Sequence, residues 1–184
     1  MIQISFPDGN VNEFEAGVTG HEIALSISEG LARNALAVKV DGKLIDLHAP
    51  ITRDATVKII TFKDDEGKHM FWHSSAHLLA HAVKRLYPEA LPTIGPAIEE
   101  GFYYDFDNLS ISSDDFEKIE AEMKKIVKEK IQTKRIDYQT KEEALKEFSH
   151  NKYKVEMIEN LEEGLSAYEQ GDFVDLCRGP HIPN

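Results

Sequence analysis

The chain has 184 residues, of which 33 are acidic and 21 basic, so its formal net charge is −12. This balance argues against strong non-specific binding of nucleic acid by the chain alone, because phosphate contacts supply most of that affinity. A run of about 18 apolar residues is lacking, which predicts no membrane span. The start has no signal-peptide pattern, and the single cysteine excludes an internal disulfide framework and suits the cytoplasm.

Residues 1–62 are predicted to form a small mixed domain with the element order of a ubiquitin-like β-grasp. Apolar and polar residues alternate from position 2, as in a half-buried strand. Thr19 and Glu22 have the spacing of a helix-capping box, and Gly30 is the expected end of that helix. The expected elements are a strand at 2–6, a turn at 7–10, a strand at 11–14, a helix over about 19–30, a hairpin of 35–40 and 44–46, and a strand at 56–62.

A charged segment at 63–68 is predicted to be a linker, followed by a larger second domain over 69–184. The predicted fold class is α+β throughout, and the second domain is expected to have a mainly antiparallel sheet with flanking helices. Its expected elements are a helix over about 68–86, a strand within 101–106, a helix from 112 to about 131, a helix over 140–148, and strands at 153–157 and 172–177.

Four histidines occur at four-residue intervals on the first helix of this second domain: His69, His73, His77 and His81. Each interval advances about 40° around a helix, so the outer two are about 120° and roughly 18 Å apart and cannot share one site. An adjacent pair can share one. We favour His73 and His77, because His69 lies at the linker end.

A second pair of potential ligands or proton carriers, Cys177 and His181, is also four residues apart, and Gly179-Pro180 between them predicts a turn. Three imidazoles and one thiol match the ligand types of a tetrahedral zinc site. They match equally a metal-free site in which imidazoles and a thiol hold a water molecule. The residues alone leave both interpretations open.

Several motifs, in order over the whole chain, resemble the editing region of bacterial-type threonyl-tRNA synthetases, and residues 1–62 resemble the TGS domain of that family. The motifs are the His-Ser-Ser-Ala-His-Leu-Leu-Ala run at 73–80, Ile94-Gly95-Pro96, the Gly-Phe-Tyr-Tyr-Asp-Phe run at 101–106, Tyr153-Lys154, and the Asp-Leu-Cys-Arg-Gly-Pro-His run at 175–181. A lone His-x-x-x-His would be weak evidence, but the coincidence of these motifs is specific.

The resemblance implies a proofreading enzyme that hydrolyses seryl-tRNA(Thr) and spares threonyl-tRNA(Thr). A threonine site rejects serine poorly, because one missing methylene-sized group is worth only about 1–3 kcal/mol. The resemblance implies that five residues are catalytic: His73, His77, Cys177, His181 and Lys154. Of these, His73 and Cys177 are expected to position water and transfer protons. Asp175 is expected to pair with the substrate ammonium, and Tyr104 to contact the substrate.

The resemblance also carries expectations about cofactor and partners. The related alanyl-type editing domains hold zinc at the corresponding positions, whereas the threonyl type is expected to work without it, so no metal is favoured here. The partners expected are the 3′ end of tRNA(Thr) carrying serine and the aminoacylation and anticodon-binding domains of the same polypeptide, which this stretch lacks. The full-length enzyme is expected to be a homodimer.

Three rival interpretations come from other classes of protein. The first is a zinc-stabilised binding module without activity, which stoichiometric zinc would favour. The second is a free-standing deacylase of the alanyl-editing type, disfavoured by the β-grasp unit and the 101–106 motif. The third is a regulatory TGS module that binds RNA or nucleotide, but residues 1–62 contain no glycine-rich phosphate loop.

Overall fold

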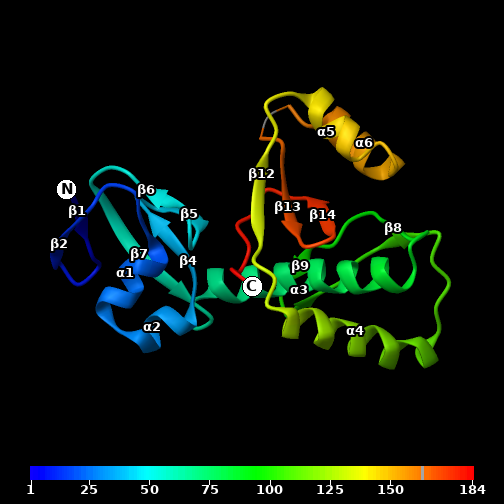
Figure 1. Cartoon of the computed structure of the whole chain (residues 1–184), viewed down its shortest axis with the longest axis horizontal. Helices are drawn as coiled ribbons and strands as arrows, with labels where there is room; N and C mark the ends of the chain where they lie inside the picture. The colour runs from blue at the N-terminus through cyan, green and yellow to red at the C-terminus, as the bar shows by residue number, and fades with distance from the viewer. Residues whose placement is uncertain (163) are drawn as a thin grey trace. The chain divides into compact units, whose positions relative to one another are not determined.

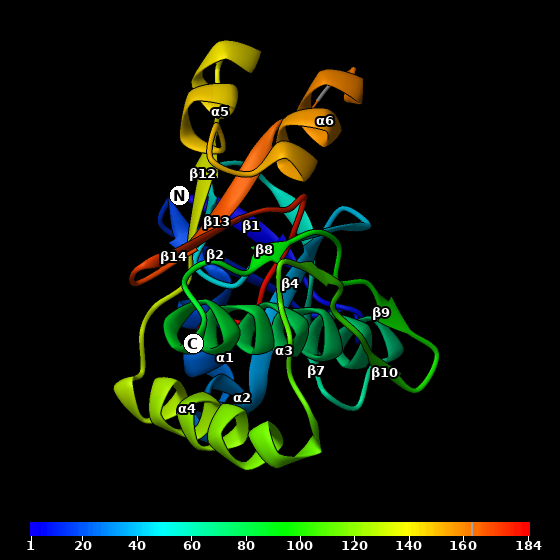
Figure 2. The ribbon, with the colours of Figure 1, turned by 90° about the vertical axis from the view of Figure 1, so that its right-hand side faces the viewer.

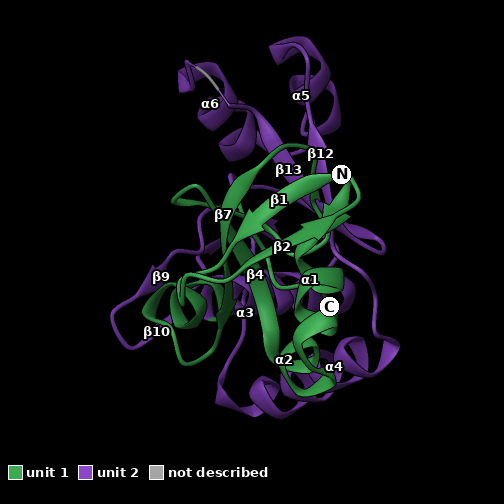
Figure 3. Ribbon diagram, turned by 90° about the vertical axis from the view of Figure 1, so that its left-hand side faces the viewer, with its two compact units in different colours: residues 1–71, 179–183 green, residues 72–178, 184 purple. Residues whose placement is uncertain are grey.

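The computed structural model describes residues 1–162 and 164–184. It divides into two compact units, residues 1–71 with 179–183 and residues 72–178 with Asn184 (Figure 3). The domain bounds expected from the sequence, 1–62 and 69–184 around a linker, stay a prediction. Among the described residues, no helix combines the length and apolar character needed to cross a bilayer.

The first unit is built on a five-stranded sheet in the order β2-β1-β7-β4-β5 (Figure 1). β1 and β2 form an antiparallel hairpin, β1 runs parallel to β7, and β4 pairs antiparallel with β5 and β7. A separate short pair joins β3 and β6. The bounds are β1 Ile2–Ser5, β2 Val11–Phe14, β3 Val18–Thr19, β4 Ala35–Val40, β5 Lys43–Asp46, β6 Pro50–Ile51 and β7 Ala55–Thr61. This arrangement confirms the expected β-grasp class.

Two short helices, α1 (Gly20–Ile27) and α2 (Glu29–Asn34), follow the β1–β2 hairpin. The predicted capping box is present, since the Thr19 side chain accepts from the Glu22 amide and the Glu22 carboxylate accepts from the Thr19 amide. The predicted stop at Gly30 is wrong. Ser28 ends α1 and caps α2, because its hydroxyl accepts from the Leu31 amide.

The core of the first unit is aliphatic and lies between the sheet and α1. Ile4, Ile23, Val38 and Val57 are fully buried and belong to one cluster. Gly20 permits close packing there, because a Cβ at Gly20 would lie 2.7 Å from the Val38 Cβ. Burial of branched side chains is therefore the dominant stabilising term in this unit.

The 22-residue helix α3 (Asp65–Leu86) contains the division between the units and supplies the predicted site histidines. It begins earlier than the expected position 68, and its acidic first turn suits the positive end of a helix dipole. In the second unit one side of α3 packs on α4 (Phe116–Glu129). The other side packs through Ala76 and Ala80 into a separate apolar cluster. Figure 2 shows α3 between α4 and the β13–β14 hairpin.

The second unit contains a three-stranded antiparallel sheet, β12-β13-β14, and two short antiparallel pairs, β8 with β11 and β9 with β10. The predicted α+β class with mainly antiparallel sheets is confirmed. The remaining bounds are β8 Leu91–Pro92, β9 Ala97–Ile98, β10 Gly101–Phe102, β11 Phe106–Asp107, the 3-10 turn Ser113–Asp115, β12 Lys134–Asp137, α5 Lys141–Glu147, α6 Lys152–Asn160, β13 Ser166–Gln170 and β14 Phe173–Leu176.

Two elements of the second unit were assigned wrongly from the sequence. The segment 153–157, expected as a strand, lies in α6 (Lys152–Asn160). Asn151 starts this helix, because its side-chain oxygen accepts from the amides of Tyr153 and Lys154. The continuous strand expected within 101–106 is instead split between β10 and β11, which pair with different partners.

Candidate active site

Three histidines on successive turns of α3 meet alternate residues of the β13–β14 hairpin. The three pairs are His73 with Cys177, His77 with Asp175, and His81 with Phe173. Four helical residues rise about 6 Å and two strand residues span about 6.6 Å, so the two repeats nearly match. Alternate strand residues share one face. The result is a ladder of three contacts between α3 and one face of β14 and its end, which we call the histidine ladder.

The first contact of the histidine ladder joins an imidazole to a thiol: His73 Nε2 lies 2.9 Å from Cys177 Sγ. The hairpin fixes Cys177 through its backbone. Its amide donates to the Ser166 carbonyl at 3.0 Å, and its carbonyl accepts from the Ser166 hydroxyl at 2.6 Å. Ser166 is buried. The thiol is thus held by rigid backbone within proton-transfer distance of an imidazole.

The second contact belongs to a buried network around Asp175. Lys154 Nζ lies 2.7 Å from Asp175 Oδ1, and the Tyr104 hydroxyl donates to Asp175 Oδ2 at 2.5 Å. His77 Nδ1 lies 3.4 Å from the same Oδ2. Lys154 also donates to the Tyr104 hydroxyl at 3.3 Å. Lys154 and Asp175 are only 3% and 2% exposed, so the carboxylate is satisfied by buried partners rather than by water.

Burial shifts the protonation of two members of this network. Burial, followed by the positive partners His73 and Lys154, lowers the pKa of His77 well below its usual value. Burial, followed by the charge of Asp175 and the hydrogen bond to it, raises the pKa of Tyr104 well above its usual value. At neutral pH, His77 is therefore an uncharged imidazole and Tyr104 an uncharged hydroxyl donor.

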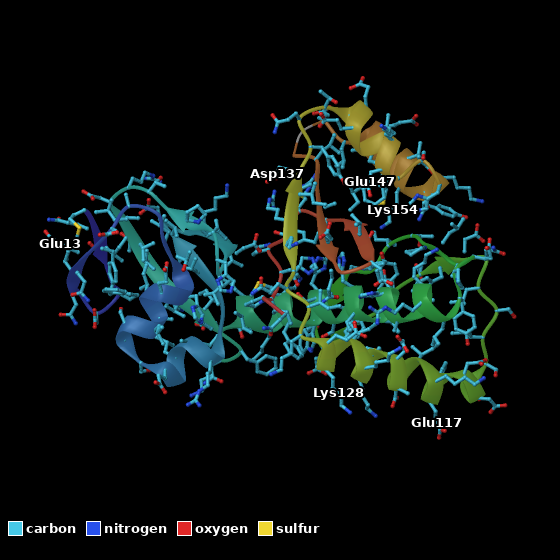
Figure 4. All side chains as sticks on the ribbon, viewed as in Figure 1. Glu13, Glu117, Lys128, Asp137, Glu147 and Lys154 are labelled. Carbon is cyan, nitrogen blue, oxygen red and sulfur yellow. The ribbon has the colours of Figure 1, made fainter. Side chains whose placement is uncertain are left out.

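Lys154 comes from the first turn of α6, not from the strand that the sequence predicted (Figure 4). The capping residue Asn151 is 3% exposed and also donates to the Pro92 carbonyl at 2.8 Å. This single side chain therefore starts α6 and attaches it to the end of β8. The direction in which the Lys154 side chain extends is therefore set by that attachment.

Tyr104 is positioned by contact with a glycine that has no side chain. A Cβ at Gly95 would lie 2.1 Å from the Tyr104 ring, a distance that no real structure allows. The ring also stacks on Phe106 at 5.0 Å. Gly95 belongs to one of the motifs singled out in the sequence, and its close approach to Tyr104 supplies a physical reason for glycine there.

A cavity of about 280 Å³ adjoins the Lys154–Asp175 pair. Its wall also includes His150 and residues from α3 and the β13–β14 hairpin. Pockets for drug-sized ligands usually span about 300–1,000 Å³. This one therefore has the size for a small polar group such as an amino acid.

The structure places most of the predicted residues in one neighbourhood of the second unit. These are His73, His77, Tyr104, Lys154, Asp175 and Cys177. His181 lies in segment 179–183, which groups with the first unit, where its amide donates to Asp46 Oδ1 at 3.1 Å. Its part in the chemistry stays a prediction, as do the catalytic and binding roles of the others.

Three members of the histidine and cysteine set predicted from the sequence lie in the second unit and could hold a metal ion there: His73, His77 and Cys177. The ligand atoms of His73, His77 and Cys177 lie within 4.8 Å of one another. Imidazoles and a thiolate suit zinc, and a carboxylate beside a ligating imidazole is a usual outer partner. The chemical types of these residues therefore fit zinc.

Sequence reasoning did not assign His81 to the site, although it is 1% exposed and lies one turn beyond His77. Spacing alone argued that the four histidines cannot share one centre, and that argument holds. The missing step was that an extended strand beside a helix can contact successive turns. The i, i+4, i+8 spacing with alternating residues at 173, 175 and 177 was the available signal.

Family models match two parts of the chain. A TGS domain model matches residues 2–61, and a model of the threonyl and alanyl tRNA synthetase second additional domain matches residues 165–184. The first match agrees with the β-grasp sheet of the first unit. The second covers β13, β14 and the segment that follows them, and so includes Asp175 and Cys177.

Whole-chain relatives are bacterial threonine–tRNA ligases. The chain is 53% identical over 185 residues to that of Desulfatibacillum aliphaticivorans, an alignment covering 100% of the chain and 29% of the relative. The ligases of Streptococcus agalactiae and Parabacteroides distasonis are 52% and 51% identical, again over 100% of the chain and 29% of each relative. The chain thus spans under a third of these relatives. The chain thus carries a TGS match and a second-additional-domain match, and over its whole length it is similar to the N-terminal regions of bacterial threonine–tRNA ligases.

Proposed function

We propose that the second unit hydrolyses the ester of tRNA(Thr) mischarged with serine and spares the threonyl ester. The observation that carries this proposal is the His73–Cys177 contact at 2.9 Å beside the buried Lys154–Asp175–Tyr104 network. The relatives' names support tRNA(Thr) as the partner, and a threonine enzyme needs protection against serine, because the two differ by one methyl group.

In the proposed reaction, a water molecule attacks the carbonyl carbon of the ester. His73 and Cys177 hold this water, and one of them takes its proton as the new carbon–oxygen bond forms. The bond between that carbon and the ribose oxygen then breaks, and the ribose oxygen receives a proton. The products are free serine and tRNA with an intact terminal hydroxyl. His77 is neutral and lies next to Asp175. It is therefore suited to accept a hydrogen bond or a proton rather than to act as a fixed cation.

Asp175 is the proposed acceptor for the substrate α-ammonium. Its Oδ1 already pairs with Lys154 and its Oδ2 with Tyr104, so a bound ammonium shares the carboxylate with them. A carboxylate offers about four acceptor positions, which leaves room for this additional donor. Lys154, beside the same carboxylate, is the proposed group that offsets the negative charge developing on the carbonyl oxygen.

Discrimination against threonine is assigned to Tyr104. The ring lies against Gly95 and stacks on Phe106, so it cannot easily yield to an added methyl group. A site with rigid walls can exclude a larger substrate by steric overlap, whereas a site that merely gains contacts discriminates by only about 10–200-fold. The fixed ring therefore suits a sieve that excludes the larger side chain.

His181 is proposed as the fourth member of the reaction centre, supported by its spacing of four residues from Cys177. If zinc is bound, His73, His77, Cys177 and His181 would hold it, and it would lower the pKa of a bound water and polarise the ester carbonyl. We favour the reaction without a resident metal. The roles above belong to side chains of this chain.

A second candidate function is a zinc-stabilised binding module without hydrolytic activity. It is favoured by one observation, the closely spaced histidine and cysteine donor set. It predicts stoichiometric zinc in the purified protein and a fall in thermal stability on chelation. The hydrolytic proposal predicts activity that survives chelation.

The test is single-turnover hydrolysis, with the protein in excess over seryl-tRNA(Thr) or threonyl-tRNA(Thr), with and without a chelator. We expect chelator-resistant loss of the seryl ester only. His73→Gln should slow it by about 10²–10⁴-fold, the usual contribution of acid–base catalysis. His69→Gln is the matched control, since His69 is an exposed histidine of the same helix. Equal loss of both esters, or an unaffected His73 variant, would contradict the proposal.

A further inference from the structure

The third contact of the histidine ladder involves groups that the proposed reaction does not use. The His81 ring stacks on Phe173, with centroids 5.3 Å apart and planes inclined by 12°. Its Nε2 lies 2.7 Å from Asp172 Oδ1, and its Nδ1 lies 3.4 Å from Gln170 Oε1. Asp172 lies in the turn of the β13–β14 hairpin, and Gln170 and Phe173 are the strand residues that flank it. A single buried imidazole thus contacts both sides of that turn.

Charge reinforces this attachment. Arg85, one turn further along α3, donates to Asp172 Oδ1 at 3.0 Å and binds the Glu129 carboxylate with two bonds of 2.8 and 3.0 Å. Although burial opposes ionisation, hydrogen bonds from Arg85 and His81 lower the pKa of Asp172 to about 2. Asp172 therefore remains a carboxylate that links the hairpin turn to α3 and α4.

We propose that His81 is a positioning residue that sets the register of the β13–β14 hairpin on α3 and thereby holds the Cys177 thiol against His73. The other two contacts of the ladder consist of groups that transfer protons or bind substrate during turnover. The His81 contact lies at the far end of β14 and involves no reacting group. It fixes the strand while the other two contacts change.

The geometry explains why register is the sensitive quantity. Phe173, Asp175 and Cys177 share a face of the strand, while Val174 and Leu176 pack into a separate apolar cluster on the other face. A shift by one residue would exchange the two faces. Smaller displacements matter as well, because about 1 Å of misplacement at a reacting centre can cost about 100-fold in rate.

The inference rests on the proposed function only for its effect on hydrolysis, so its test includes a second measurement without tRNA. Cys177 is the only cysteine of the chain, and its alkylation by iodoacetamide therefore reports directly on the thiol beside His73. The rate is measured on folded protein at one neutral pH with a chelator present. Thermal unfolding of each variant is measured in parallel.

The variants remove the contact from each side. His81→Leu deletes the two polar contacts of the imidazole. Asp172→Ala deletes the contacts of the turn carboxylate with His81 and Arg85, at a side chain that is 64% exposed. His81→Gln keeps a donor and serves as the conservative rescue. Ile126→Val trims a buried side chain of α4 on the other side of α3 and is the control for general loss of stability.

We expect His81→Leu to slow both alkylation and single-turnover hydrolysis by about tenfold or more, within the range expected for a misplaced reacting group. The half-saturating protein concentration should stay unchanged. Asp172→Ala should also slow both alkylation and hydrolysis. His81→Gln should recover most of both rates. Unchanged alkylation in His81→Leu and Asp172→Ala, or equal slowing in Ile126→Val, would overturn the inference. If wild-type protein leaves the seryl ester intact, the proposed function fails while the alkylation series still decides the role of His81.

Discussion

The two units differ in whether they bury charged side chains beside their apolar residues. The centre of the first unit is aliphatic, with Ile4, Ile23, Val38 and Val57 fully buried. The second unit buries a lysine, an aspartate and two histidines beside its small alanines. Burial of charge costs free energy that a well-packed apolar core would not cost. Buried charges that lower the stability of a fold are typical of functional sites. Their presence therefore places the candidate site in the second unit.

The largest effect should come from breaking the buried ion pair. Lys154→Met leaves Asp175 without its cation, and we expect a loss of about 3–5 kcal/mol in the free energy of unfolding. The double variant Lys154→Met with Asp175→Leu should lose less than the sum of the single variants. Denaturant unfolding of all four proteins measures the coupling. Additive losses would show that the pair does not contribute as a unit and would weaken the contrast between the units.

A somewhat smaller loss is expected in the apolar core of the first unit. Ile23→Ala removes a fully buried side chain packed against the sheet, at a cost of about 2–5 kcal/mol. Because no charge is involved, this loss should be the same at pH 5.5 and pH 8, as measured by denaturant unfolding. A loss that changes by more than about 1 kcal/mol between these pH values would contradict a purely apolar account.

Gly95→Ala tests whether a single methyl group disturbs the polar site. The new Cβ would overlap the Tyr104 ring, so the ring must move. Overpacking of this kind costs about 1–3 kcal/mol of stability, and displacement of Tyr104 should slow seryl-ester hydrolysis by about 100-fold. Gly30→Ala is the control, because Gly30 is helical and an added Cβ would meet only ordinary van der Waals contact, with the Ser28 hydroxyl oxygen at 3.9 Å. Wild-type selectivity and rate in Gly95→Ala would remove Tyr104 from the proposed sieve.

The smallest effect is the pH dependence of stability that comes from His77 in the second unit. Burial lowers the pKa of His77 below its unfolded value near 6.5, so the unfolded chain binds the proton more readily. The stability due to neutral His77 is fully present above pH 6.5 and falls with pH below that value, by up to about 1.4 kcal/mol per pH unit. Urea unfolding between pH 7.5 and 5 should therefore show a slope that His77→Gln reduces and His69→Gln preserves. Parallel slopes in wild type and His77→Gln would contradict a buried neutral imidazole.

Much of this molecule follows from local patterns in the sequence. Thr19 with Glu22 and Thr140 with Glu143 set the starts of two helices through contacts only a few residues apart. The mixed class also follows from such patterns. The meeting of His73 with Cys177, which are 104 residues apart, was instead expected from the resemblance to a known family. Helix α6 was missed because its start depends on Asn151, whose amide bonds the distant Pro92 carbonyl. The role of His81 was missed for a related reason, since its partners lie about 90 residues away.

The matched repeats of α3 and β14 restrict how the chain length can vary during evolution. One residue gained or lost between His73 and His81 rotates part of the helix by about 100°, and one gained or lost between Asp172 and Cys177 inverts a strand face. Either event separates an imidazole from its partner. Insertions and deletions among descendants of this sequence should therefore accumulate in the connecting loops and be absent from these two short stretches.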